Sequence, residues 1–157
     1  MHLTPSSAKV NILTMPQERD LISGIVQLAN LLNRRLAPVF EKANVTPQQW
    51  AVLTVIAAEE EAMTLASVAR RLAVSKQNMT GMMTRLEQLA LVERAEDPED
   101  LRSAKVRLTR RGRSIIERLT PAYETWRESL GTDIGARDLQ TVARAVNRLI
   151  ERLEQES

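Results

Sequence analysis

The sequence predicts a mainly α protein, a winged helix-turn-helix with long helices before and after it. Three observations lead to this prediction. Few segments alternate apolar and polar residues, so helices are expected to predominate over strands. Two short helical segments joined by a tight turn lie between Thr64 and Leu89. Two strand-like segments, 91–95 and 102–108, follow directly and predict a hairpin.

The composition is that of an ordinary globular protein with one domain and an aliphatic core. Of 157 residues, 43% are hydrophobic, 27% charged and 3% aromatic. The net charge is only +2, so total charge does not indicate a polyanionic partner. The distribution is more informative, because residues 105–113 hold five cations and no acid, whereas residues 151–157 are acidic. Such local asymmetry favours the steering of a polyanion.

The sequence argues against several classes of function. It has no cysteine, which excludes disulfides, thiolate zinc sites and thiol redox sensing. The single histidine, His2, lies near the start, so we expect no metal site, no cofactor and no enzyme. No apolar run approaches the roughly 20 residues that span a bilayer, and no signal pattern begins the chain. We therefore expect a cytoplasmic protein without a membrane partner.

The N-terminal part is predicted as a tail, 1–15, and a long helical segment, 16–45. The helix runs from about Pro16 to Glu41, and Pro38 should end or kink it. Its apolar residues form two adjoining stripes, more than a helix on the surface of a small domain needs. It is either a central core helix or a helix shared with a second subunit.

Residues 46–112 are predicted to form the winged helix-turn-helix domain. Thr46, Pro47 and Gln49 have the pattern of a capping box at a helix start. This helix is expected to bury four residues: Trp50, Leu53, Ile56 and Ala57. The acidic run 59–61 after it is interpreted as a solvated helix end, because consecutive helical residues point in different directions.

Thr64 and Ser75 are expected to cap the two helices of the helix-turn-helix, which are separated by a break at residues 73–74. The second helix should bury Met79, Met83 and Leu86, as core residues. Its other face is polar and carries Lys76, Gln77, Thr80, Gly81, Thr84 and Arg85. Such a helix is suited to a polar, anionic partner and is the candidate recognition helix.

Residues 113–157 are predicted as C-terminal dimerisation helices. Thr109 caps the first of them, and Pro121 should bend it or split it. The last helix runs from about Arg137 to Glu154 and has a nearly strict 4-3 apolar repeat: Leu139, Val142, Val146, Leu149 and Leu153. This repeat could pack within its own chain, but together with the first helix it suggests an intertwined dimer interface.

The order of elements and several motifs resemble the MarR family of bacterial transcriptional regulators over about residues 18–154. The motifs are 91–94 (LVER), 97–98 (DP), 100–102 (DLR) and 108–112 (LTRRG). The resemblance implies a homodimer whose two winged domains bind a pseudo-palindromic operator in double-stranded DNA. It also implies a repressor released by a small, often phenolic or anionic, effector.

The sequence departs from the family pattern at two positions. Ala90 stands where glycine is usual after the recognition helix, so the turn there is expected to differ. Leu101 replaces the first of two basic residues that often follow the aspartate of the wing, which leaves Arg102 as the clear cation.

The candidate DNA-binding residues of the recognition helix have separate expected roles. The amides of Gln77 and Asn78 can pair with base edges. Lys76, Thr84 and the late Arg85 suit phosphate contacts, although Arg85 could also bind guanine. Ser75 is a helix cap that can also donate to a phosphate, and Thr80 shares the polar face.

Gly81 is unusual because a glycine in mid-helix costs up to about 1 kcal/mol relative to alanine. Either close approach to DNA or tight packing on a neighbouring helix should offset this cost, and both remain open.

In the wing, Arg102 is expected to enter the minor groove, where the potential is more negative. Asp100 should support Arg94 or Arg102, and Lys105 and Arg107 should attract phosphates. An effector pocket is expected between the dimer helices and the DNA-binding lobe, with Trp50 as a candidate wall, unless that tryptophan simply packs.

The residues thus favour a sequence-specific DNA-binding regulator, expected to be a homodimeric repressor. Two alternatives remain: a winged-helix protein-interaction module without DNA-binding activity, or a family member that acts as an activator.

Overall fold

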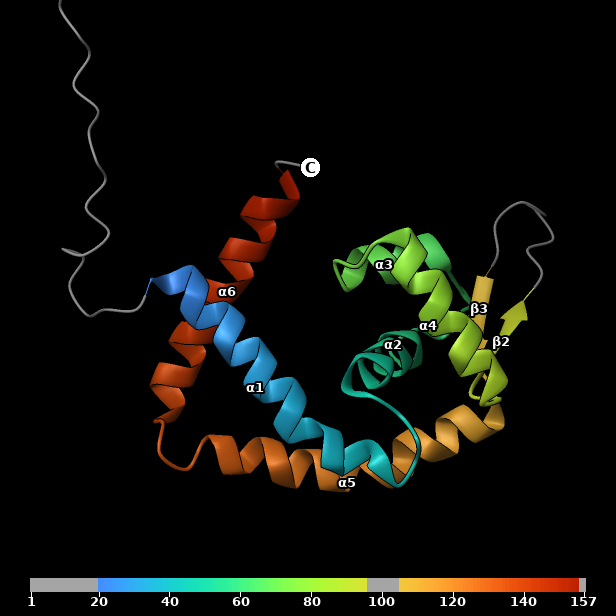
Figure 1. Cartoon of the computed structure of the whole chain (residues 1–157), viewed down its shortest axis with the longest axis horizontal. Helices are drawn as coiled ribbons and strands as arrows, with labels where there is room; N and C mark the ends of the chain where they lie inside the picture. Colours follow the sequence, from blue (N-terminus) through green and yellow to red (C-terminus); the bar gives the residue numbers. More distant parts are fainter. Residues whose placement is uncertain (1–19, 96–104, 156–157) are drawn as a thin grey trace, which may run out of the picture. The chain divides into compact units, whose positions relative to one another are not determined.

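The helices and strands follow the predicted order. The computed structural model describes residues 20–95 and 105–155 and divides into two units, 1–35 and 36–157. Helix α1 (Leu21–Glu41) begins in the first unit and ends in the second. The second unit also holds α2 (Pro47–Ala57), β1 (Met63–Thr64), α3 (Leu65–Arg71), α4 (Lys76–Gln88), β2 (Val92–Ala95), β3 (Lys105–Leu108), α5 (Arg110–Leu130) and α6 (Ala136–Gln155) (Figure 1).

Capping side chains fix where the helices begin. The Thr46 hydroxyl accepts from the Gln49 backbone N–H at 3.2 Å, and Gln49 Oε1 accepts from the Thr46 N–H at 3.0 Å. The predicted capping box is therefore confirmed. Thr64, Ser75 and Thr109 cap α3, α4 and α5 in the predicted way, each accepting from the N–H three residues on.

The predicted hairpin is present, and it belongs to a three-stranded antiparallel sheet of order β1-β3-β2. Val92 pairs with Leu108 and Ala95 with Lys105, so β2 and β3 are in register over their whole length. The two-residue strand β1 was not predicted; Met63 pairs with Val106 on the other edge of β3. Arg102 to Ala104, the start of the second predicted strand, lie outside the described residues.

The core of the second unit is mainly aliphatic and lies between the helices and the sheet of the DNA-binding lobe, residues 46–112, with α4 beside β2 (Figure 1). It contains the predicted Trp50, Leu53 and Ile56. Ala57 was wrongly placed in it: this residue is exposed at the end of α2, and Val52, with no exposed surface, is buried instead. Helix α2 contacts α3, α5 and β3, and Val52 is buried by such contacts, whereas Ala57 is the last residue of the helix.

Neither proline inside a helix ends it. Helix α1 continues through Pro38 to Glu41, and α5 is one helix across Pro121 rather than two pieces. Pro121 removes one backbone hydrogen bond. Leu119 before it is buried and Tyr123 after it packs against the core, which holds α5 together at this point.

Helix α6 differs from the other helices of its unit because none of its residues is buried within the described chain. The whole 4-3 repeat is exposed, from 38% of the surface at Leu149 to 64% at Leu153. In the first unit, most of the large apolar residues of α1 are exposed as well: Leu21, Ile22, Ile25, Val26, Leu28 and Leu31. The predicted tail, 1–15, and the expected helix start at Pro16 lie outside the described residues.

Candidate nucleic-acid interface

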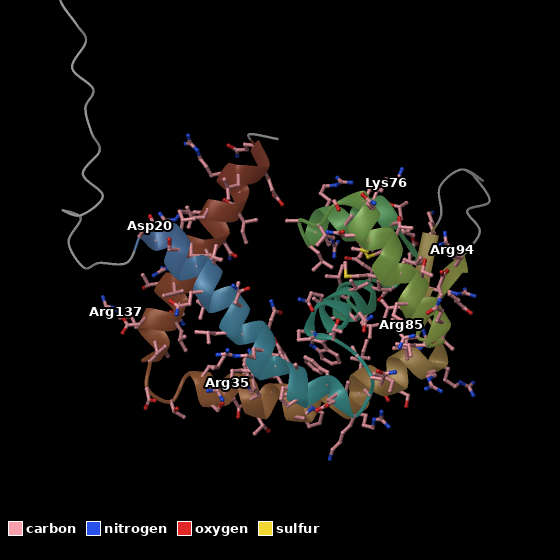
Figure 2. The ribbon with its side chains drawn as sticks, in the orientation of Figure 1. Asp20, Arg35, Lys76, Arg85, Arg94 and Arg137 are labelled. Carbon is pink, nitrogen blue, oxygen red and sulfur yellow. The ribbon has the colours of Figure 1, made fainter. Side chains whose placement is uncertain are left out.

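Helix α4 separates its buried and exposed faces cleanly. Met79, Met83 and Leu86 have no exposed surface and anchor the helix in the core, as predicted. The candidate DNA-binding residues of this helix and its cap are all exposed: Ser75, Lys76, Gln77, Asn78, Thr80, Gly81, Thr84 and Arg85. Lys76 and Arg85 lie towards opposite ends of α4, so cations flank the amide and hydroxyl groups (Figure 2).

Gly81 lies near the middle of the exposed face. A Cβ at this position would find no heavy atom of the described chain within 4 Å. Tight packing on a neighbouring helix, one of the two explanations open from the sequence, is therefore wrong. The bare backbone of Gly81 is instead accessible from outside.

The hydroxyl groups of the two exposed threonines are bonded to their own helix. Thr80 Oγ1 donates to the Lys76 carbonyl oxygen at 2.9 Å, and Thr84 Oγ1 donates to the Thr80 carbonyl oxygen at 3.0 Å. Each hydroxyl has one proton, so neither can donate to a further partner without giving up this bond.

Gln88 was missed in the sequence and lies on the same exposed face. Residues 77, 81, 84 and 88 are separated by four, three and four positions, which places them on one side of a helix. The spacing from Gln77 could have identified Gln88. Gln88 is the last residue of α4, far from the helix start where recognition helices usually contact bases.

An ion pair connects the recognition helix to the wing. Arg94 Nε on β2 donates to Glu87 Oε1 on α4 at 2.8 Å. Asp100, the partner expected from the sequence, lies outside the described residues, as does Arg102. Glu87 is a supporting residue that the sequence did not single out, because seven residues and a turn separate it from Arg94.

The cations of the hairpin strands occupy different environments. Arg107 Nε pairs across the strands with Glu93 Oε1 at 2.7 Å, and both side chains are about half exposed. Lys105 is half-buried at the end of β3, in register with Thr64 and Ala95. The positive charge of Arg107 is thus partly balanced within the sheet.

Hydrogen bonds join the turn after α4 to the start of α5. Thr109 Oγ1 donates to the Ala90 carbonyl at 2.6 Å, and the Thr109 N–H donates to the Leu91 carbonyl at 3.1 Å. A Cβ on Gly112 would lie 2.1 Å from the Leu91 oxygen, so only glycine fits there. Ala90 has φ 56°, the left-handed conformation that glycine would adopt. The expected change in this turn is therefore wrong: alanine accepts the strained conformation because these bonds hold it.

All four aromatic residues of the chain gather at one place in the second unit. Trp50 is 6% exposed and stacks on Phe40 at the end of α1, with ring centroids 4.9 Å apart. Tyr123 on α5 lies 5.7 Å from Trp50 and 6.4 Å from Trp126. This aromatic cluster joins the end of α1 to α2 and α5.

The described residues show neither a metal site nor a membrane-spanning helix. Over residues 20–95 and 105–155, no three His, Cys, Asp or Glu side chains come together as a metal site. In the same part of the chain, no helix has the length and apolar character needed to cross a membrane.

A sequence model described as the MarR family matches residues 43–103 of the chain, which include α2, the helix-turn-helix and β2. The Transcriptional activatory protein BadR of Rhodopseudomonas palustris is 33% identical over 132 residues. This alignment covers 83% of the chain and 74% of BadR.

Two solved structures have a similar fold. NadR in complex with 4-hydroxyphenylacetate has a TM-score of 0.72 and 23% identity, with 87% of this chain and 96% of NadR covered. The MepR–DNA complex from S. aureus has a TM-score of 0.77 and 16% identity, with 87% of this chain and 99% of MepR covered. At these identities the likeness concerns the fold alone.

Proposed function

The chain belongs to the MarR family of transcriptional regulators, and we propose that it acts as a homodimer binding a pseudo-palindromic operator in double-stranded DNA. The single observation that supports DNA binding best is the exposed face of α4. It combines amides, cations and a bare glycine backbone on a helix whose other face is fixed in the core. Such a helix can enter a major groove without rearrangement of the lobe.

We assign the contacts on α4 by their chemistry. We propose that Gln77 and Asn78 bind base edges, because a side-chain amide matches the donor and acceptor pair of adenine. Lys76 and Arg85 lie at the two ends of the exposed face. In this proposal they bind phosphates and fix the position of the protein along the duplex. Ser75 adds a helix start whose free N–H groups favour a phosphate. The wing contributes Arg102 to the minor groove, with Lys105 near the backbone.

The dimer is proposed from the exposed apolar face of α6. Its repeat is left uncovered within the described chain, and burying it needs a second helix of the same pattern. A second copy supplies that helix and also places two recognition helices on one duplex. Two symmetric half-sites then give the pseudo-palindrome, with centres about 34 Å apart.

We propose repression as the direction of regulation, because a dimer bound over a promoter excludes the polymerase. Activation is the alternative, since the relative BadR is named an activatory protein. The position of the operator decides between the two. No enzymatic activity is proposed, and a protein acting on bacterial DNA acts in the cytoplasm.

An effector is proposed to act at the aromatic cluster. Trp50, Phe40 and Tyr123 connect the end of α1 to the DNA-binding lobe, so a ligand that separates these rings would change the lobe's position. The ligand of NadR, 4-hydroxyphenylacetate, is a phenolic carboxylate, the class that we propose here. A panel of such compounds should change tryptophan fluorescence and release DNA together in a Trp126→Phe variant, which keeps Trp50. Release of DNA without a change at Trp50 would place the pocket elsewhere.

The test of DNA binding uses duplexes selected by the purified protein from a random-sequence pool. Affinity should fall steeply as salt rises, because Lys76, Arg85 and Arg102 displace counterions from phosphates. Gly81→Ala should weaken binding about tenfold, since a methyl group keeps the helix from the base edges, while raising the free energy of unfolding by about 0.5–1 kcal/mol.

The matched control for Gly81→Ala is Ser114→Ala, at an exposed position of α5, which gains helix propensity without touching α4. It should stabilise the protein and leave DNA affinity unchanged. A flat response to salt, or no selected sequence at all, would contradict DNA binding and favour the protein-interaction module.

A further inference from the structure

We infer that α4 recognises A·T base pairs through the methyl group of Thr84, which contacts the C5-methyl group of a thymine in the major groove. The inference rests on the proposed function and names what the recognition helix selects. It replaces the phosphate contact that the sequence suggested for Thr84.

The hydroxyl of Thr84 is not available to donate a hydrogen bond to a phosphate. Its proton is donated to the Thr80 carbonyl oxygen at 3.0 Å. Phosphate oxygens only accept hydrogen bonds, so a direct contact with one would require the loss of this helix bond. With the hydroxyl turned against its own backbone, the methyl group is what Thr84 offers to a partner. A threonine methyl in the major groove matches the methyl group of thymine.

Gly81 allows so short a side chain to reach the bases. It lies three residues before Thr84 and therefore next to it on the exposed face. No heavy atom of the described chain approaches within 4 Å of the place of its missing Cβ. A groove surface can therefore come close to the backbone at Gly81, which brings the Thr84 methyl into contact with base edges.

Gln77 favours the same base pair, A·T, as the methyl group of Thr84. It lies four residues before Gly81 and seven before Thr84, on one face of α4. An amide in this place can bond N6 and N7 of adenine, and the thymine methyl projects into the same groove from the opposite base. Amide and methyl together select A·T pairs, and neither group binds a G·C pair as well.

The bond from a threonine hydroxyl to its helix is not specific by itself. Thr125 on α5 makes the same bond, to the Pro121 carbonyl at 3.0 Å, and is also exposed. Thr80 on α4 also makes this bond. What distinguishes Thr84 is its place in line with Gly81 and Gln77 on one face of α4, three residues after the uncovered glycine and seven after the amide. Thr125 therefore provides a matched control.

The experiment compares thymine with deoxyuridine, which pairs identically and lacks only the methyl group. Duplexes are selected from a random-sequence pool made with thymidine, and the best duplex is then synthesised with deoxyuridine in place of thymidine. Binding to the deoxyuridine duplex should be weaker by about fourfold for each half-site, the factor for one buried carbon, hence about fifteenfold for a dimer.

Three variants assign this difference to one contact. Thr84→Ser keeps the hydroxyl and loses the methyl, so it should bind the two duplexes equally. Thr84→Val keeps a methyl and loses the hydroxyl, so it should still prefer thymidine. Thr125→Ser should show the full preference of the unaltered protein. Circular dichroism confirms that each variant is folded.

The outcomes separate the inference from the proposed function. Equal binding of both duplexes by the unaltered protein overturns the inference and leaves DNA binding intact. A preference for thymidine that persists in Thr84→Ser also overturns it, because the methyl effect then comes from DNA shape or from another residue. If no sequence is selected from the pool, the proposed function itself fails.

Discussion

The winged lobe and helix α6 belong to the same unit but are stabilised in opposite ways. In the lobe, Met79, Met83 and Leu86 of α4 and Val106 of β3 have no exposed surface. Side chains cap the starts of α2, α3, α4 and α5. In α6, no residue is buried within the described chain, although its apolar repeat is as regular as any in the sequence. We therefore expect the lobe to stay folded when the dimer separates, whereas the apolar face of α6 needs a partner to bury it.

Because of this difference, substitutions in the lobe and substitutions in α6 should have different effects. A change inside the lobe should unfold the DNA-binding surface even if the dimer persists. A change on the apolar face of α6 should separate the subunits and leave the lobe intact.

Gly112→Ala should have the largest effect, because the new Cβ would lie 2.1 Å from the Leu91 carbonyl oxygen, a backbone atom that cannot turn aside. We expect a loss of about 3 kcal/mol or more in the free energy of unfolding, towards the upper end of overpacking effects. Chemical denaturation followed by circular dichroism measures it.

The control is Gly135→Ala, where the nearest atom would be Asp138 Oδ2 at 4.0 Å. It should change stability by less than about 1 kcal/mol. Equal stability of the two variants would contradict the conclusion that only glycine fits at position 112, in the junction between α4 and α5.

Val146→Glu should break the dimer, because it places a charge at the centre of the α6 repeat. Burying an unpaired carboxylate is so unfavourable that the dissociation constant should rise about a hundredfold or more. Analytical ultracentrifugation measures the subunit mass, and circular dichroism should show that the helices of the lobe remain.

Gln140→Glu introduces the same charge on the opposite, exposed side of α6 and should leave the dimer intact. A Val146→Glu protein that is still dimeric would mean that α6 does not form the subunit interface. One that unfolds completely would mean that the lobe is not independent of the dimer.

Ala90→Gly should have a smaller effect, with the opposite sign. Alanine at φ 56° is strained, and glycine relieves that strain while increasing the freedom of the unfolded chain. We expect a net gain of about 0.5–1 kcal/mol in the free energy of unfolding, measured by thermal or chemical denaturation. Ala122→Gly, in the exposed interior of α5, should instead lose about 1 kcal/mol. A loss at Ala90 would show that the turn is not strained.

The sequence predicted the features that local chemistry decides. The capping box at Thr46 and the caps at Thr64, Ser75 and Thr109 depend on residues three apart, so the sequence alone was enough to predict them. The hairpin followed from alternating residues and was found in register. The polar face of α4 was also predicted from spacing, and every candidate residue on it is exposed.

The features that were missed depend on contacts between distant segments. Strand β1 is only two residues long and exists because Met63 and Thr64 pair with β3, more than forty positions later in the chain. Ala57 was misplaced because it is the last residue of α2 and is exposed there, whereas contacts with other elements bury Val52, which the expected stripe did not include. The pairing of Glu87 with Arg94 and the left-handed Ala90 likewise required the folded junction.

Two copies of the lobe, joined through their helices, are proposed to bind one duplex. Native mass spectrometry of the protein with a selected duplex tests it most directly, because the mass gives the number of chains on each DNA. We predict two chains per duplex for the unaltered protein, and a loss of this complex for Val146→Glu. One chain per duplex, or a Val146→Glu complex as stable as the original, would contradict the claim.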